Sequence, residues 1–214
     1  LVERPWIATP ALALALVLAY PLRDAWALDL ARPRLWQPLT CVFVHADLLH
    51  LLSNALALLA FGTLCELIQG TWRTAVVFLY SGVGASLAYG WWRSSALTTL
   101  ALHGRLRGAS GAVFGLLGAH AAQFALNWSS TPWRRVWFVG VALFVISEIV
   151  LYVVDPVDGT AYSAHVFGAV HGALFGYWLF CNAVWSTWEP TVQRITLVVS
   201  LLLCVGSALA LFLR

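Results

Sequence analysis

The sequence predicts an all-α fold, a polytopic membrane helix bundle of about seven transmembrane helices. Two observations predict it. Of the 214 residues, 61% are hydrophobic and 10% are charged, and the mean hydropathy is +0.83, which is more apolar than a soluble domain of this size. Apolar runs long enough to cross a bilayer core of about 30 Å then recur seven times, at approximately 6–22, 48–67, 74–92, 109–127, 135–154, 162–184 and 195–213.

The first run is the weakest of the seven, because Pro10 interrupts it and Arg23 and Asp24 close it early. The longest connection, 23–47, follows it and mixes arginines with tryptophans and leucines. Segments of this composition usually lie in the plane of the membrane interface. The other six runs have the length and apolar composition expected of transmembrane helices.

The distribution of charge and cysteine excludes several classes of function. The net charge of +3 arises from twelve scattered arginines, so nothing resembles a nucleic-acid-binding surface and we expect no nucleic acid partner. The four cysteines lie in or beside apolar runs without CxxC spacing, as small buried hydrophobes do. No HExxH motif occurs, and we expect neither a metal nor another cofactor. We interpret the start at Leu1, which is not methionine, as a trimmed or processed start.

Alternation of helix direction places four polar residues at one depth. If seven helices alternate, the second, fourth and sixth begin at the same membrane face, and the first turns of these three carry His50, Asn54, Ser110 and His165. Polar side chains inside a lipid-immersed bundle are costly unless they are paired and face the interior, so they are candidates for function. The ordinary preference of Ser and Asn for helix starts is the alternative explanation. Arginine counts on the two sides, five against seven, do not decide sidedness.

Ser110 has the surroundings of a nucleophile. Hydrolysis of a peptide bond needs a nucleophile, a base that takes its proton, and donors for the developing oxyanion. Gly108 and Gly111 flank Ser110, so the backbone can turn tightly and a substrate carbonyl can come close. A helix start also offers free N–H groups and the positive end of the helix dipole, which favour an oxyanion.

Among the six histidines, His165 is the best candidate for the base. His120 lies ten residues beyond Ser110 and therefore about 15 Å deeper, at 1.5 Å per residue. His171 lies six residues beyond His165 on a different face of its helix, and it is the runner-up.

Small residues explain how two such helices can come close. They recur every fourth position in the sixth and fourth runs, at Gly168, Gly172 and Gly176 in the one and at Gly111, Gly115 and Ala119 in the other. Such stripes allow close approach of transmembrane backbones, although they also occur in bundles without catalysis. Phe114, one turn below Ser110, is expected to hold the His165 ring by stacking.

His50 and Asn54 are four residues apart and share one helix face, so both can donate to a single oxyanion. No acid occupies a comparable level. Glu66 lies about 18 Å further down the same helix, where we expect it to satisfy helix ends near the opposite surface. Glu148 lies near the middle of the fifth run, and its role does not follow from the sequence. We therefore expect a Ser–His dyad and not a triad.

These residues together resemble a known family. Gly108-Ala109-Ser110-Gly111, the segment Ala164-His165-Val166-Phe167-Gly168 with Gly172, and the trio His45, His50 and Asn54 are similar to the signature motifs of rhomboid intramembrane serine proteases. The resemblance runs from about Arg34 to Trp188. It is closest to the secretase-type members, which have six core helices, here about 6–184, and an extra C-terminal helix, here about 195–213, in a single membrane domain over 1–214.

The resemblance implies an activity and a set of site residues. It implies a serine endopeptidase that cleaves single-pass transmembrane proteins near the membrane surface through an acyl-enzyme. Ser110 is then the nucleophile, His165 the general base and acid, and His50, Asn54 and the Ser110 amide the oxyanion donors, with Phe114, Gly108 and Gly168 positioning them. A loop after the fifth helix, about 155–161, is implied to cover a site that opens to the lumenal, extracellular or periplasmic side.

Two positions depart from the family pattern. Trp36-Gln37 stands where the loop after the first helix usually carries Trp-Arg, which leaves the anchoring of that loop open. Phe114 stands where a tyrosine is common, which keeps the ring and loses a hydroxyl.

Two other functions and several membranes are compatible with this sequence. A non-proteolytic rhomboid-like protein that binds and escorts membrane clients is the alternative function, although such relatives typically lack the serine or the histidine. A small transporter would need a polar path across the whole bilayer, which the clustering at one level does not favour. The expected location is the Golgi, the plasma membrane or another secretory-pathway membrane, or the inner membrane of a bacterium.

Overall fold

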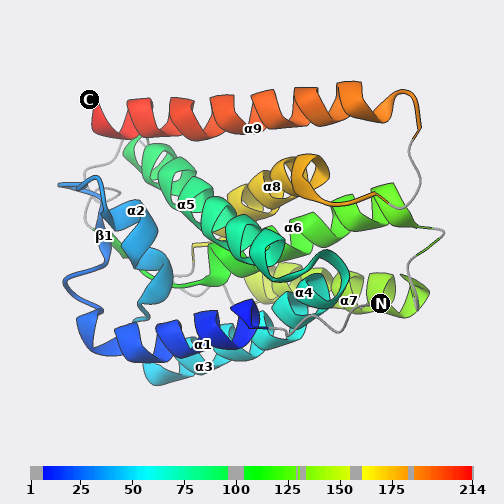
Figure 1. The fold of residues 1–214 in the computed structure, drawn as a ribbon. Coiled ribbons are helices and arrows are strands. Elements are labelled where there is room, and N and C mark those ends of the chain that lie inside the picture. Colours follow the sequence, from blue (N-terminus) through cyan, green and yellow to red (C-terminus); the bar gives the residue numbers. More distant parts are fainter. Residues whose placement is uncertain are drawn as a thin grey trace.

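A computed structural model describes residues 7–95, 104–128, 130, 134–154, 161–182 and 186–213. It confirms the predicted all-α helix bundle (Figure 1). The α-helices are α1 (Ala8–Ala19), α2 (Gln37–Thr40), α3 (Leu48–Ala57), α4 (Thr63–Gln69), α5 (Thr71–Ser95), α6 (Ser110–Asn127), α7 (Arg134–Val154), α8 (Tyr162–Leu179) and α9 (Glu189–Phe212). Short turns of other helix types are η1 (Tyr20–Leu22), η2 (Cys41–Phe43) and the π-helical turn η3 (Leu58–Gly62), and two short strands, β1 (Leu28–Asp29) and β2 (Arg105–Leu106), pair antiparallel.

Each of the seven predicted runs contains one long helical segment, but two boundaries differ from the predicted ones by five or six residues. The sixth helix, α8, ends at Leu179, five residues before the predicted end. There the side chain of Gln69 accepts the N–H of Cys181 (2.8 Å), so a side chain replaces the next helical bond. The last helix begins at Glu189, six residues early, because the Glu189 carboxylate accepts the N–H of Ser186 (3.0 Å) and caps the turn.

Length and hydropathy alone single out two membrane-crossing candidates among the described residues. They are the continuous segment of α3, η3 and α4, Leu48–Gln69, and α9, Glu189–Phe212. The first helix, Ala8–Leu22 with its 3₁₀ turn, is apolar but shorter, in line with its weak sequence signal. Pro10 lies in its first turn, where the missing N–H has no helical acceptor to lose.

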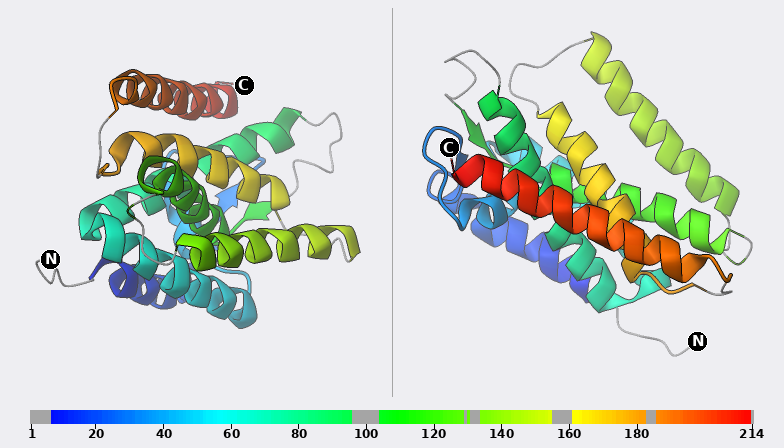
Figure 2. Two further views of the ribbon diagram at one scale, coloured as in Figure 1. Left: turned by 90° about the vertical axis from the view of Figure 1, so that its right-hand side faces the viewer. Right: turned by 90° about the horizontal axis from the view of Figure 1, so that it is seen from above.

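Helix α6 forms the centre of the bundle, and in Figure 2 the other helices surround it. Fourteen of its eighteen residues are buried. Helices α8 and α5 pack on one side of it, and α9 lies across both of them on the outside (Figure 1). The start of α6 therefore lies at one end of the bundle, which we call the site end. Its last residue, Asn127, lies at the other, the distal end.

The crossing of α6 and α8 is an almost direct contact of two backbones. A Cβ atom on Gly168 would overlap the carbonyl group of Gly111, and one on Gly172 would overlap that of Gly115. Helix axes normally lie 8–10 Å apart because side chains separate them. Glycine is therefore required at 168 and 172 on α8, and at Gly118 on α6, where a Cβ atom would lie 2.0 Å from the carbonyl oxygen of Ala169. The small-residue stripes predicted from the sequence meet here.

The segment formed by α3, η3 and α4 contains a π-helical turn, η3. Two buried polar residues, His120 and Glu66, form hydrogen bonds in or near this segment. His120 Nε2 donates to the carbonyl of Phe61 within this turn (3.0 Å), which explains its deep position. Glu66, further along the segment, accepts the N–H groups of Ile7, Ala8 and Thr9 (2.7–2.8 Å). The expectation that Glu66 satisfies a helix end away from the candidate site is confirmed.

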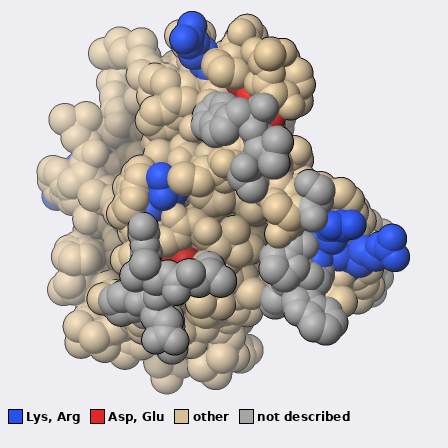
Figure 3. Space-filling model, turned by 45° about the vertical axis from the view of Figure 1, so that its right-hand side comes forward, with Lys and Arg blue, Asp and Glu red and all other residues tan. Residues whose placement is uncertain are grey.

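Helices α7 and α9 occupy the outside of the bundle. Helix α9 is tied to α5 by a hydrogen bond between Tyr80 and Ser200 (2.8 Å), and Leu211 packs on Gly90. Helix α7 lies at the edge (Figure 2), where the rings of Phe138 and Phe144 contact aromatic residues of α6 and η3. On the face drawn in Figure 3 the basic side chains form small separate patches, and small acidic spots also appear, in a surface that is mostly uncharged.

The close crossing generates a prediction about stability. Gly172→Ala should lower the thermal unfolding midpoint of the detergent-purified protein, by an amount equivalent to about 1–3 kcal/mol, because the added methyl group forces α8 away from Gly115. Gly140→Ala is the matched control, since nothing lies within 4 Å of the added atom on α7. Equal midpoints for the two variants would contradict the tight crossing.

Candidate functional site

Ser110 is the first residue of α6, and the turn before it requires a glycine. Gly108 has φ +130°, a conformation that residues with a side chain rarely adopt. A Cβ atom at Gly108 would also lie 2.9 Å from Cε1 and 3.0 Å from Nε2 of His50. Both the backbone conformation and the close approach of the imidazole therefore exclude any side chain at this position.

The Ser110 hydroxyl and the His50 ring both lie beside Gly108. The point where a Gly108 Cβ would stand is 3.8 Å from Ser110 Oγ and 3.0 Å from His50 Nε2. His50 is held at the start of α3 by Asp47, whose carboxylate accepts the His50 N–H (2.8 Å). Asn54 is buried one turn further on, and its amide donates one hydrogen to the His50 carbonyl (2.9 Å).

His165 is the fourth residue of α8 and lies beside the first turn of α6. Its ring, 9% exposed, stacks on Phe114 with centroids 4.3 Å apart and planes 8° from parallel. The carbonyl of the preceding residue, Ala164, lies 3.5 Å from the point where a Cβ of Gly111 would stand. Tyr162 contacts the imidazole edge-on at 5.8 Å. The structure thus brings His165 and Ser110 to the same corner of the bundle, with Phe114 beneath the imidazole.

The other histidines considered as bases do not join this corner. His171 faces α5, where its ring lies against Gly84 and contacts Tyr80 edge-on at 5.8 Å. His120 is bonded to Phe61, as described above. Glu148 lies in α7, but its side chain is outside the described residues, and so is most of the expected covering loop, 155–160.

Sequence reasoning assigned no separate role to His45, which holds the nucleophile turn. His45 is fully buried before α3, and its Nε2 accepts the N–H of Ala109 (3.2 Å), the residue that precedes Ser110. Its ring also contacts His50 edge-on at 5.1 Å. The sequence signal for His45 was its place in the trio His45, His50 and Asn54, which the family resemblance singles out.

Burial keeps the His45 imidazole neutral. Loss of solvation, reinforced by the neighbouring His50, lowers the pKa of His45 to about 3, while Asp47 opposes this shift. A neutral ring with its proton on Nδ1 can accept at Nε2, as the bond to Ala109 requires.

The connection after the first helix supplies further anchors. The Gly108 N–H donates to the carbonyl of Cys41 (3.0 Å), whose thiol lies 3.2 Å from the Ser86 hydroxyl. Gln37, the departure noted in the sequence, is buried and accepts the N–H of Arg34 (2.9 Å). The Gln37 side-chain oxygen therefore stabilises a turn within the connection 23–47.

The arrangement suits acyl transfer. A hydroxyl stands at a helix N-terminus, a buried imidazole lies beside that turn, and a second imidazole approaches from α3. Within the described part of the chain, no group of three His, Cys, Asp or Glu side chains gathers in a way that could hold a metal ion.

Comparison with known proteins bears on this arrangement. A family model described as "Rhomboid domain" matches residues 32–182. The chain is 30% identical over 165 residues to RHOMBOID-like protein 7 of Arabidopsis thaliana, covering 77% of this chain and 49% of that protein. It is 31% identical over 171 residues to Rhomboid-related protein 1 of Caenorhabditis elegans, covering 78% and 46%. The chain therefore spans about half the length of these relatives.

Neutral His45 generates a prediction about pH. Below about pH 6.5 the unfolded protein takes up a proton at His45 that the folded protein does not bind until about pH 3, so folding stability falls as the pH is lowered through this window. In His45→Gln, whose amide oxygen can still accept from Ala109, the fall should be shallower by at most about 1.4 kcal/mol per pH unit. Thermal unfolding of the two proteins between pH 4 and 8 measures this, and parallel profiles would refute it.

Proposed function

This chain belongs to the rhomboid family of integral membrane proteins, and on that premise we propose that it is an intramembrane serine endopeptidase. The observation that carries the proposal is the convergence of Ser110, His50 and His165 at one corner of the bundle. Family membership alone does not supply the activity, because a member can bind membrane clients without cleaving them. A nucleophile with a candidate base beside it is what proteolysis needs in addition.

The chemistry is acyl transfer in two steps. His165 takes the proton of the Ser110 hydroxyl as Oγ attacks the substrate carbonyl, and the negative charge forms on the carbonyl oxygen. The N–H of Ser110, the His50 ring and the second amide hydrogen of Asn54 are the donors for that oxyanion. His165 then protonates the leaving amine, and water, activated by the same imidazole, hydrolyses the ester on Ser110.

Two rings orient His165 in this proposal. Phe114 supports one face of the imidazole and Tyr162 meets its edge. We propose that these rings, and not a carboxylate as in a Ser–His–Asp triad, orient the imidazole of a Ser–His dyad. Close packing of α6 and α8 fixes the distance between the two helices that carry the reacting groups.

The substrates we propose are single-pass transmembrane proteins that enter sideways from the bilayer. Helix α7 lies at the edge of the bundle and meets it through aromatic rings, so a helix can approach beside it. An apolar hollow lined by Leu64, Ile68, His120, Phe124 and Val141 lies between α4, α6 and α7. A substrate helix must unwind near the site end, because an intact helix uses its carbonyls in its own hydrogen bonds, so helix-breaking residues there favour cleavage.

Removal of the nucleophile or the base tests the proposal. Ser110→Ala and His165→Ala should abolish cleavage of a reconstituted single-pass substrate, and Ser110→Ala should also abolish labelling by a fluorophosphonate, since no hydroxyl remains to attack. Ser147→Ala, which removes an exposed hydroxyl from α7, is the control and should keep full activity. Cleavage by purified Ser110→Ala would refute the assignment, and substrate binding by an unlabelled wild-type protein would indicate client binding without proteolysis.

The oxyanion assignment has its own test. Asn54→Ala should lower kcat by about 10- to 1000-fold with a smaller change in KM, because the amide acts mainly on charge that develops in the transition state. The folded fraction of the variant is checked by its thermal unfolding midpoint, since Asn54 also bonds the His50 carbonyl. An unchanged kcat in folded protein would remove Asn54 from the oxyanion site.

A further inference from the structure

The segment that leads to Ser110, the lead-in segment (104–109), is held along its length by the first connection (23–47). At its start the Gly104 carbonyl accepts the N–H of Leu30 (3.2 Å), and β2 then pairs with β1. At its end the last two amides are bound by the same connection, as described above. Between these links, a charged contact also joins the lead-in segment to the first connection.

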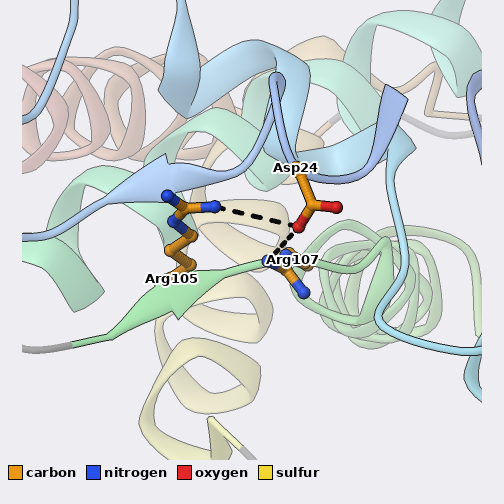
Figure 4. A network of polar contacts seen from close by, with 3 residues as sticks. All are labelled: Asp24, Arg105 and Arg107. Atoms are coloured by element: carbon orange, nitrogen blue, oxygen red, sulfur yellow. Dashed lines mark hydrogen bonds and ion pairs between the residues drawn. The ribbon is translucent and has the colours of Figure 1, made fainter. Parts of the chain in front are cut away.

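That contact is a cluster of two arginines around one carboxylate (Figure 4). Arg107 Nη2 donates to Asp24 Oδ1 at 2.8 Å, and Arg105 Nη1 lies 3.8 Å from the same oxygen. Asp24 belongs to the first connection, whereas both arginines belong to the lead-in segment. Both contacts join the lead-in segment to the first connection, so charge is used between these two segments in a chain that is only 10% charged.

Arg107 depends on this contact more than Arg105 does. Its side chain is 21% exposed against 50% for Arg105, and its Nε is buried without a hydrogen-bond partner in the described structure. A guanidinium that has lost part of its hydration is stabilised by the nearby carboxylate. Asp24 is 69% exposed, so the interaction is accessible to dissolved salt.

The contact between Arg107 and Asp24 bears on the conformation of Gly108, because the two residues Arg107 and Gly108 are adjacent in the chain. Arg107 immediately precedes Gly108, and a glycine can change φ at little cost. The positive φ that directs Ser110 toward His50 must therefore be set by the residues on both sides of Gly108. His45 holds the Ala109 side, and Asp24 holds the Arg107 side.

We propose that Asp24, Arg105 and Arg107 form an electrostatic clamp that positions the nucleophile turn, with Asp24 and Arg107 as positioning residues for Ser110. The inference rests on the proposed role of Ser110 and adds what holds that serine in place. Gln37 does not serve this purpose, because its oxygen accepts amides of its own connection, Arg34 and Asp29. The clamp joins the two segments by charge at the one point where the glycine hinge begins.

The test measures the reactivity of Ser110 in four proteins: wild type, Asp24→Asn, Arg107→Gln and the double variant. The rate of fluorophosphonate labelling should fall two- to fivefold in each single variant, the range that an exposed ion pair can supply. It should fall no further in the double variant, because both changes remove one interaction. Arg32→Gln, an exposed arginine on the same connection that takes part in no described ion pair, is the matched control and should label at the wild-type rate.

Salt and hydrogen exchange separate positioning from general stability. In 1 M NaCl the wild-type labelling rate should approach that of the single variants, whose own rates should change little. The amides of Gly108 and Ala109 should exchange faster in the variants at 25 °C than in wild type, under conditions where the proteins remain folded.

Each outcome decides the inference. A lower unfolding midpoint with unchanged labelling and exchange in folded protein would show that the ion pairs only stabilise the fold, and would overturn the clamp. The clamp would also be overturned if the losses of labelling rate in the two single variants added up in the double variant, or if Arg32→Gln lowered the labelling rate as much as they do. If wild type itself is not labelled, the proposed function fails, and amide exchange of Gly108 and Ala109 still decides whether the clamp exists.

Discussion

The backbone contact between α6 and α8 is the constraint on which the rest of this structure depends. Gly111, Gly115, Gly168 and Gly172 leave no side chains between the two helices, so the start of one is held beside the start of the other. A lipid environment offers no hydrophobic force to bring helices together, and close van der Waals packing has to provide the association instead. The hydroxyl at the first residue of α6 and the imidazole in the first turn of α8 become neighbours as a consequence of this packing.

The same contact also sets where α5 must lie. The Ser81 side chain of α5 fills the space beside Gly115, so three helices meet at this glycine. Helix α9 then adds to the outside through Tyr80, whose ring stacks on Phe175 of α8 at 3.9 Å. The C-terminal helix is therefore connected to α8 through Tyr80 and also directly, because Gln193 Nε2 donates to the Tyr177 carbonyl (3.5 Å), and it forms part of the scaffold behind the candidate site.

Three buried polar side chains inside the bundle, Glu66, His120 and Gln69, each complete a broken backbone pattern. Glu66 accepts the free amides at the start of α1, His120 donates within the π-helical turn, and Gln69 takes over the first amide after α8. Unsatisfied backbone groups are costly in a membrane, which explains these positions without a catalytic role. His50, Asn54, Ser110 and His165 are different, because they lie at one corner of the bundle, where the proposed function gives them a catalytic role.

Much of the architecture could be predicted from the sequence, because hydrophobic run length and small-residue periodicity are local properties. The seven helical segments, the glycine stripes and the common depth of Ser110 and His165 followed from counting residues. Helix ends were less predictable, since the end of α8 depends on Gln69, a residue more than a hundred positions away. Side chains from distant segments decide such boundaries, and no local pattern reports them.

The sequence by itself determined the helices and the residue types that the proposed chemistry requires, whereas the tertiary structure decided how the turn before Ser110 is held. His45 on Ala109, Cys41 on Gly108 and Asp24 on Arg107 join segments more than sixty residues apart. None of these contacts has a periodicity or a motif, because each depends on the path of an irregular connection. The physical reason is that helix formation follows the spacing of residues along the chain, while the conformation of a glycine hinge follows from the groups that happen to surround it in space.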